Sequence, residues 1–310
     1  MRKKITVIGA GNVGATAAHC CLRRELGEIV LVDVTGNIPE GKALDLAQAA
    51  VLEGHAARVR GTADYADTAG SDIVIITAGV SRKPGMSRDD LLKTNLDIVT
   101  RVTAQAAEHS PEALFIIASN PVDVMCGAAL QAGHVPCRRI VGLSGVLDAA
   151  RMRAFIAGYA GVPLEAVQGM VIGEHGEFMV PLPRLASING IPAPVLLTAG
   201  QLEDVRKSTV SGGAGIVSLL GYSAYYAPGM ALATMVEALL NDSGNILPCS
   251  VYLENRYGAR GIFMCVPARL NAQGVEEIIE LELDEAEKTA LDRSIANIGS
   301  NMAKAGLNPA

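Results

Sequence analysis

The 310-residue sequence contains no tryptophan, and its aromatic content is only 4%. Nucleic-acid-binding proteins need basic side chains to neutralise phosphates, and those that bind single strands also use aromatic rings as stacking platforms. Here 26 Lys and Arg stand against 32 Asp and Glu, which gives a formal net charge of −6. The composition therefore argues against a nucleic acid as a partner.

Charged residues are also scarce, at 19%, whereas hydrophobic residues make up 50%. A disordered chain would show the opposite balance. No apolar run approaches the roughly 20 residues that span a bilayer. The basic residues at 2–4 precede an apolar run as in a signal peptide, but glycines interrupt that run from Gly9 onward. We therefore expect a cytoplasmic protein that binds no membrane.

The cysteines form no C-x-x-C pair, and no histidine stands at zinc-ligand spacing from two of them. The simplest interpretation is a set of free thiols that act as small apolar residues in a reducing compartment. We expect no metal site. The residues concerned are Cys20, Cys21, Cys126, Cys137, Cys249 and Cys265.

The first half alternates short apolar runs with helical segments. Nearly continuous Val and Ile runs separated by helices are typical of a parallel sheet covered on both faces. This pattern predicts an α/β fold that begins with a doubly wound parallel-sheet Rossmann domain at 1–144. Strands are expected at 4–9, 28–33, 58–61, 72–78, 113–119 and 139–142, and helices at 12–25, 39–53, 89–109 and 122–132.

The second half has a different pattern and predicts an α+β substrate or catalytic domain at 145–310. Its first helix starts near 145, with Ser144 as a plausible N-cap. Further helices are expected at 202–219, 225–240 and 284–305, and strands at 180–188, 246–252 and 262–269.

A G-x-G-x-x-G motif follows the first predicted strand and opens the first predicted helix. In a dinucleotide-binding turn, its glycines permit the tight bend and the close approach of a pyrophosphate to the helix N-terminus. Asp33 ends the second strand, 19 positions after Gly14, where a carboxylate would bind ribose hydroxyls and repel a 2′-phosphate. The motif therefore favours NAD over NADP. The alternative is a tight strand–helix turn without a ligand.

Three other segments contain groups suited to catalysis. His175 lies in a GEHG segment after an apolar run, and it could equally be a turn histidine. Asp148 and Arg151 share one helix face, where the simpler interpretation is a surface ion pair of roughly 0.2–0.5 kcal/mol. The loop at 79–91 contains several cations between glycines and a proline, and it could be a solvated loop.

Taken together, these segments resemble the lactate/malate dehydrogenase family of 2-hydroxy acid dehydrogenases, and within it the malate-specific members. The resemblance covers essentially the whole chain and preserves the order of the motifs. The matching segments are GAGNVG at 9–14, VD at 32–33, ITAG at 76–79, the RKPGMSR loop at 82–88, SNPVD at 119–123, LDAAR at 147–151, GEHG at 173–176 and GYSAYYAPG at 221–229.

The resemblance implies roles for the site residues. His175 would be the general acid/base, paired with Asp148, and Arg151 would grip the substrate carboxylate next to the reacting carbon. Arg88 would polarise the carbonyl. Arg82 stands where lactate dehydrogenases have a neutral Gln, so it would pair with a second carboxylate of malate or oxaloacetate.

The resemblance also implies a cofactor site and an assembly. Asn120 and Ser223 would contact the substrate, and the cofactor would be NAD. A homodimer or homotetramer is expected. Two alternatives remain open: a lactate or other 2-hydroxy acid dehydrogenase, and a catalytically inactive NAD-binding sensor or scaffold. The implied cofactor-binding residues are Gly9, Gly11, Asn12, Val13, Gly14, Asp33, Asn95 and Asn120.

Overall fold

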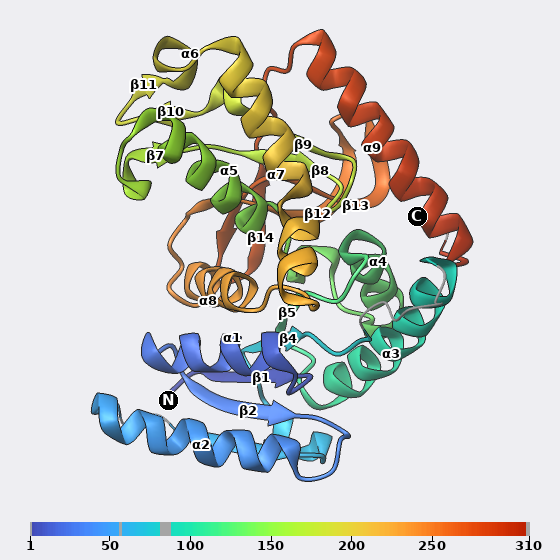
Figure 1. The fold of residues 1–310 in the computed structure, drawn as a ribbon. Coiled ribbons are helices and arrows are strands. Elements are labelled where there is room, and N and C mark those ends of the chain that lie inside the picture. The colour runs from blue at the N-terminus through green and yellow to red at the C-terminus, as the bar shows by residue number, and fades with distance from the viewer. Residues whose placement is uncertain (1, 56–57, 81–87, 308–310) are drawn as a thin grey trace.

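A computed structural model of the chain describes residues 2–55, 58–80 and 88–307, with the Arg88 side chain left out (Figure 1). Its N-terminal half contains a parallel sheet of order β3-β2-β1-β4-β5-β6. This order, with helices between the strands, is that of a doubly wound dinucleotide-binding fold, so the predicted Rossmann architecture is confirmed. The strands are β1 (Lys4–Ile8), β2 (Glu28–Val32), β3 (Val59–Thr62), β4 (Ile73–Ile76), β5 (Leu114–Ile117) and β6 (Ile140–Gly142), and the helices are α1 (Asn12–Arg23), α2 (Ile38–Glu53), α3 (Arg88–His109) and α4 (Val122–Gly133).

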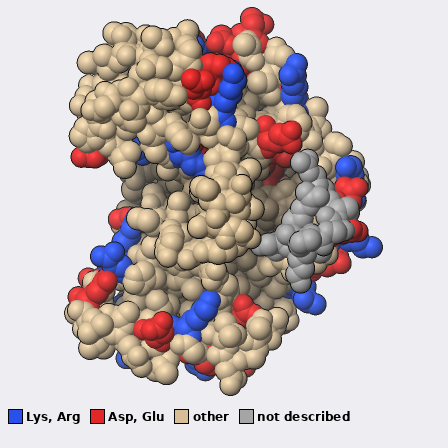
Figure 2. All heavy atoms as spheres, viewed as in Figure 1, with Lys and Arg blue, Asp and Glu red and all other residues tan. Residues whose placement is uncertain are grey.

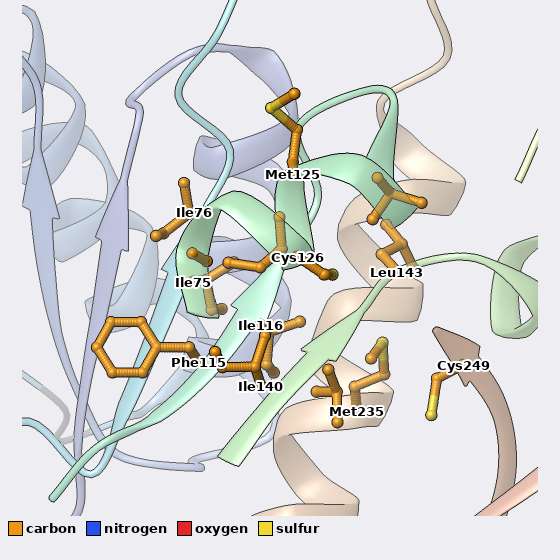
Figure 3. Close-up of a cluster of buried hydrophobic side chains, with 14 of the residues drawn as sticks. Ile75, Ile76, Phe115, Ile116, Met125, Cys126, Ile140, Leu143, Met235 and Cys249 are labelled. Carbon is orange, nitrogen blue, oxygen red and sulfur yellow. The ribbon is translucent and has the colours of Figure 1, made fainter. Parts of the chain in front are cut away.

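The central strands are buried along their whole length. Every residue of β4 and β5 is buried, as expected for Val and Ile runs covered on both faces. Figure 3 shows that the apolar core continues from these strands into the second half of the chain. The labelled side chains are Ile75, Ile76, Phe115, Ile116, Met125, Cys126, Ile140, Leu143, Met235 and Cys249.

The C-terminal half mixes long helices with antiparallel strands. A long hairpin, β12 (Ile246–Arg256) and β13 (Ala259–Asn271), forms its centre, and α8 (Tyr226–Leu240) packs against α1 (Figure 1). The other strands are β7 (Val167–Gln168), β8 (Val171–Gly173), β9 (Met179–Pro181), β10 (Ser187–Ile188), β11 (Ile191–Pro192) and β14 (Gly274–Ile278), and the helices are α5 (Gly145–Ala160), α6 (Ala193–Leu196), α7 (Ala199–Leu220), α8 (Tyr226–Leu240) and α9 (Glu285–Lys304). Short 3-10 helices lie at Tyr65–Thr68, Cys137–Arg139, Leu164–Ala166 and Pro183–Leu185.

The two halves share one sheet, which the sequence did not predict. Ser250 of β12 pairs antiparallel with Gly142 at the end of β6, so the hairpin extends the parallel sheet. A Cβ atom at Gly142 would lie 2.8 Å from Ser250 Cβ and from Cys126 Sγ, which shows why glycine allows this approach. On the other edge of the hairpin, Cys265 pairs with Gly173, two residues before His175. The sheet therefore fixes where the His175 loop begins.

One local expectation was wrong. The predicted strand at 180–188 is broken into β9, a 3-10 turn and β10, because Pro181 and Pro183 lack the N–H groups that a sheet needs. Ser144 is the N-cap residue of α5, as expected, although its side chain makes no capping hydrogen bond. The sequence analysis did not predict the strand β14, since its sequence, GVEEI, shows only a short apolar pattern.

Within the described part of the chain, no helix is both long and apolar enough to cross a membrane.

Candidate active site

The glycine turn between β1 and α1 has the geometry of a phosphate cradle. Gly9 has a φ of 105°, and a Cβ atom there would lie 2.6 Å from the main-chain nitrogen of Ala78. A Cβ atom at Gly14 would overlap the carbonyl oxygen of Gly9, so helix and turn pack as tightly as glycine permits. At Gly11, the N-cap of α1, a Cβ atom would meet nothing within 4 Å. The turn is thus closed toward the sheet and open at the helix N-terminus, where an anion is stabilised.

Asp33 follows β2 and its carboxylate faces the same turn. Its Oδ2 accepts a hydrogen bond from the Ala10 nitrogen at 2.7 Å, and its Oδ1 accepts one from the Thr35 nitrogen at 3.0 Å. Burial alone would raise the pKa of Asp33, but hydrogen bonds from the Thr35 side chain and from the main chain of Ala10, Thr35 and Val34 outweigh that effect and lower it. Asp33 is therefore a carboxylate at neutral pH.

Two cavities meet at the edge of the sheet where β1 and β4 end. One, of about 330 Å³, is lined by Gly9, Gly11 and Asp33 among others. The second, of about 340 Å³, contains His175 in its lining. Both are bordered by Thr77, Gly79 and Val80, so they adjoin each other. The strand order reverses between β1 and β4, which is where doubly wound folds bind their ligands.

The second cavity gathers residues that were predicted from distant segments: Val13, Asn95, Asn120, His175 and Ser223. Asn95 is 2% exposed, and its amide is bonded to the main chain. It accepts from the Val80 nitrogen at 2.8 Å and donates to the Asn120 oxygen at 2.8 Å. Asn95 thereby ties the loop after β4 to the loop after β5.

His175 contacts a buried ion pair on α5, formed by Asp148 and Arg151. Its Nδ1 lies 2.6 Å from Asp148 Oδ2, and Arg151 Nη1 donates to Asp148 Oδ1 at 2.7 Å. Asp148 is 1% exposed, so this is no surface ion pair. Burial alone would lower the pKa of His175, but the charge and hydrogen bond of Asp148 raise it above its usual value. The imidazole therefore favours its protonated form.

Arg151 is connected to the cavity through its ion pair with Asp148, which also binds His175 of the cavity lining. A Cβ atom at Gly212 of α7 would lie 3.3 Å from Arg151 Cδ, and one at Gly213 would lie 3.7 Å from its terminal nitrogens. Glycines at these positions of α7 therefore leave room for the guanidinium. Arg82 and the side chain of Arg88 lie outside the described residues, and α3 begins at Arg88.

Sequence reasoning missed a second carboxylate beside His175. Asp123, in the first turn of α4, accepts from the His175 nitrogen at 3.0 Å and from Ser250 Oγ at 2.6 Å. An acidic residue in a first helical turn is ordinarily explained by the helix dipole, and only the fold shows its other contact. Burial raises the pKa of Asp123 to about 6, although both hydrogen bonds oppose that shift. Burial also raises the pKa of the neighbouring Glu174, to about 7.

Comparisons with known proteins cover both halves of the chain. Residues 3–142 match the family model of the lactate/malate dehydrogenase NAD-binding domain, and residues 145–306 match that of the family's alpha/beta C-terminal domain. The chain belongs to the lactate/malate dehydrogenase family. The family resemblance inferred from the motifs is confirmed.

Individual relatives cover nearly the whole chain. The malate dehydrogenase of Desulforudis audaxviator is 51% identical over 298 residues, which is 96% of each chain. The solved malate dehydrogenase of Salinibacter ruber matches with a TM-score of 0.93, 45% identity and 97% coverage of both chains. A lactate dehydrogenase of Cryptosporidium parvum, solved with lactic acid and nicotinamide adenine dinucleotide, matches with a TM-score of 0.95 and 36% identity over 100% of this chain and 99% of its own.

Proposed function

We propose that the chain is an NAD-dependent malate dehydrogenase, which catalyses reversible hydride transfer between NADH and oxaloacetate to give (S)-malate. The observation that carries this proposal is the buried Asp148–His175 pair at a cavity adjoining the glycine turn. The similarity to malate dehydrogenases over nearly the whole chain supports the choice of substrate.

The cofactor would lie along the two adjoining cavities. Gly11, Asn12 and Val13, at the N-terminus of α1, would receive the pyrophosphate, and Asp33 would bind the adenosine ribose. Asn120 would contact the nicotinamide end. When bound, NAD supplies the hydride acceptor of the reaction. The ionised Asp33 repels a 2′-phosphate, so the site favours NAD over NADP.

His175 would donate and accept the proton of the reaction. Its Nδ1 is held by Asp148, which leaves Nε2 for the substrate oxygen. During reduction of oxaloacetate, negative charge develops on the carbonyl oxygen, and the imidazolium donates its proton there. During oxidation of malate, the neutral imidazole takes that proton back. Asp148 fixes the ring and stabilises its charged form.

Arginine side chains would hold the substrate. Arg151 would bind the carboxylate beside the reacting carbon, since a guanidinium has five N–H donors and Asp148 is bonded to one nitrogen. Arg88 would stabilise the developing charge. Arg82 would pair with the second carboxylate, and Ser223 would lie near the same end. The roles of Arg82 and Arg88 rest on their sequence positions.

Two other functions are compared with this proposal. The similarity to the Cryptosporidium lactate dehydrogenase supports a lactate or other 2-hydroxy acid dehydrogenase. A catalytically inactive NAD-binding protein would have no need of the buried His175–Asp148–Arg151 set. Steady-state rates with oxaloacetate, pyruvate and longer 2-keto acids, each with NADH and NADPH, separate these functions. We expect the highest kcat/KM with oxaloacetate and NADH, whereas a preference for pyruvate would reject the malate assignment.

We also propose that the chain is a homodimer or homotetramer in the cytoplasm. Uncharged side chains dominate the face shown in Figure 2. Large apolar side chains are exposed on α2, where Leu44, Val51 and Leu52 are 62%, 76% and 89% exposed. Such exposure is typical of surfaces that are buried in an assembly. All six cysteines are free thiols, as in proteins of reducing compartments. Light scattering after size exclusion would give the mass of the assembly.

A further inference from the structure

We propose that Asp123 is a positioning residue for His175: it holds the main chain of the His175 loop and places a second negative charge beside the imidazole. This inference rests on the proposed function, in which His175 is the general acid/base. Asp123 increases the affinity of His175 for its proton without contacting the substrate.

The geometry joins three separate elements at one carboxylate. Asp123 lies on α4, its Oδ2 accepts from the main-chain nitrogen of His175 at 3.0 Å, and its Oδ1 accepts from Ser250 Oγ of β12 at 2.6 Å. Asp123 is 2% exposed and Ser250 is fully buried. Asn120, which lines the cavity, stands three residues before Asp123. The start of α4 therefore links the cofactor side of the cavity to the loop that bears the imidazole.

The donors to Asp123 are neutral groups, a main-chain N–H and a hydroxyl. Burying a carboxylate that is hydrogen-bonded only by neutral groups lowers the stability of the folded state. Apolar side chains of similar size in its place often leave a protein equally stable. The protonated imidazole of His175 supplies a nearby positive charge. The charge of Asp123 raises the pKa of His175, in the same direction as the larger effect of Asp148.

Other charged groups near Asp123 and His175 also affect the protonation of the imidazole. From α5, Asp148 favours the imidazolium and Arg151 opposes it. On the His175 loop itself, Glu174 lies beside Asp123 and Glu177 lies beside Glu174. The Cys126 thiol of α4 lies close to Asp123, and burial raises the pKa of that thiol well above its usual value, so it stays uncharged.

The charge of Asp123 changes just below neutral pH. Because burial raises its pKa to about 6, the carboxylate is negative above pH 6 and neutral below it. The second charge is therefore present at neutral and alkaline pH, where His175 would otherwise lose its proton. Asp123 extends the imidazolium form, and with it the reduction of oxaloacetate, to higher pH.

The test is a proton NMR titration of the His175 ring in the wild type and in Asp123→Asn. The chain has only five histidines, so comparison with His175→Asn identifies the signal. Asparagine keeps the shape and can accept from the His175 nitrogen, but it removes the charge. We expect the pKa of His175 to fall by about one unit, the low end of the effect of a nearby charge. The kcat for oxaloacetate reduction above that pKa should fall about tenfold, with the KM for NADH nearly unchanged.

Asp72→Asn is the matched control. Asp72 also accepts from a main-chain nitrogen, that of Lys4 at 2.8 Å, but it precedes β4, at the opposite end of that strand from the site. Its loss should leave the His175 titration unchanged. Ser250→Ala is the second variant if Asp123→Asn does not fold. It keeps the carboxylate but removes a donor, so it should raise the pKa of Asp123 and lower that of His175 at neutral pH.

An unchanged His175 pKa in a folded Asp123→Asn or Ser250→Ala protein would overturn the proposal, even if the melting temperature fell. The NMR result does not depend on turnover. If the wild type reduces no 2-keto acid, the proposed function fails while the titration still decides the role of Asp123.

Discussion

His175 and Arg151 bind opposite oxygens of one buried carboxylate, that of Asp148, at 2.6 and 2.7 Å. The shared carboxylate fixes the position of the imidazole relative to the guanidinium. In the proposed reaction the imidazole would exchange a proton with the carbonyl oxygen, and the guanidinium would bind the adjacent carboxylate. In that reaction the geometry of Asp148 would determine how a 2-keto acid is oriented.

The two directions of the reaction should have opposite pH dependence. The folded pKa of His175 is raised, so the imidazolium is present below that pKa and is lost as the pH rises through it. Reduction of oxaloacetate needs the imidazolium and should decline above this pKa. Oxidation of malate needs the neutral ring and should decline below it. Steady-state kcat measured in both directions across the neutral range checks this prediction.

Asp148→Asn is the corresponding variant. Without the Asp148 charge, the pKa of His175 should fall, and the decline of oxaloacetate reduction should move to lower pH. Activity should fall by a factor on the order of 10²–10⁴, the usual contribution of a positioned acid or base, while NADH affinity stays close to that of the wild type. Parallel pH profiles in the two directions, with chemistry limiting the rate, would remove His175 from the mechanism.

Asp33→Ser should relax the preference for NADH. Asp33 is ionised because its hydrogen bonds lower its pKa, so the variant removes a charge that repels the 2′-phosphate. We expect the ratio of kcat/KM for NADPH to that for NADH to rise on the order of 10- to 100-fold, since each tenfold corresponds to about 1.4 kcal/mol. Asp45→Ser, an exposed carboxylate on α2, is the control and should leave the ratio unchanged. A wild type that uses both cofactors equally would contradict the role of Asp33.

Gly14→Ala should destabilise the protein and weaken NADH binding. The added Cβ atom would overlap the Gly9 oxygen, so either the turn or α1 must move. Such overpacking costs about 1–3 kcal/mol. Urea unfolding and NADH fluorescence titration measure the two effects. Gly158→Ala, in α5 with nothing within 4 Å of the added atom, should instead stabilise the fold by roughly 0.5–1 kcal/mol.

Arg82→Gln should change the substrate preference. In a closed site, the second carboxylate of oxaloacetate needs a charged partner, and with pyruvate an unpaired Arg82 would be buried at a cost of several kcal/mol. A differential of roughly 4–7 kcal/mol corresponds to a factor on the order of 10³–10⁵ in kcat/KM. Oxaloacetate activity should fall, and measurable pyruvate activity should appear.

Lys83→Gln is the matched control, because it removes the same charge one position further along the loop. It should change the ratio of oxaloacetate to pyruvate activity only slightly. The assignment of Arg82 is wrong if Arg82→Gln keeps that ratio within about tenfold of the wild type, which is about 1.4 kcal/mol, or if Lys83→Gln shifts it more.

The sequence predicted what local patterns specify. Buried strands such as β4 and β5 have uninterrupted apolar runs, and the glycine turn has a spacing with a defined geometry. The motif resemblance pointed to His175, Asp148 and Arg151, which the structure brings together. These features are predictable because each rests on residues close together in the sequence or on an ordered set of motifs.

The features that were missed depend on contacts between distant segments. Ser250 lies within an apolar strand, and only the pairing of β12 with β6 brings that strand alongside the parallel sheet. Its hydrogen bond to Asp123 spans 127 positions. No local sequence pattern shows that a serine in an apolar strand will hydrogen-bond a distant carboxylate. Likewise, no local pattern shows that an aspartate in a first helical turn will contact a distant loop.

The most direct test of the account compares NADH oxidation by the wild type and by His175→Asn, with saturating oxaloacetate and NADH. The wild type should turn over, and His175→Asn should lose a factor on the order of 10²–10⁴ in kcat while its dissociation constant for NADH stays nearly the same. A wild type that binds NADH but does not oxidise it with oxaloacetate would contradict the account, as would a His175→Asn protein that retains wild-type turnover.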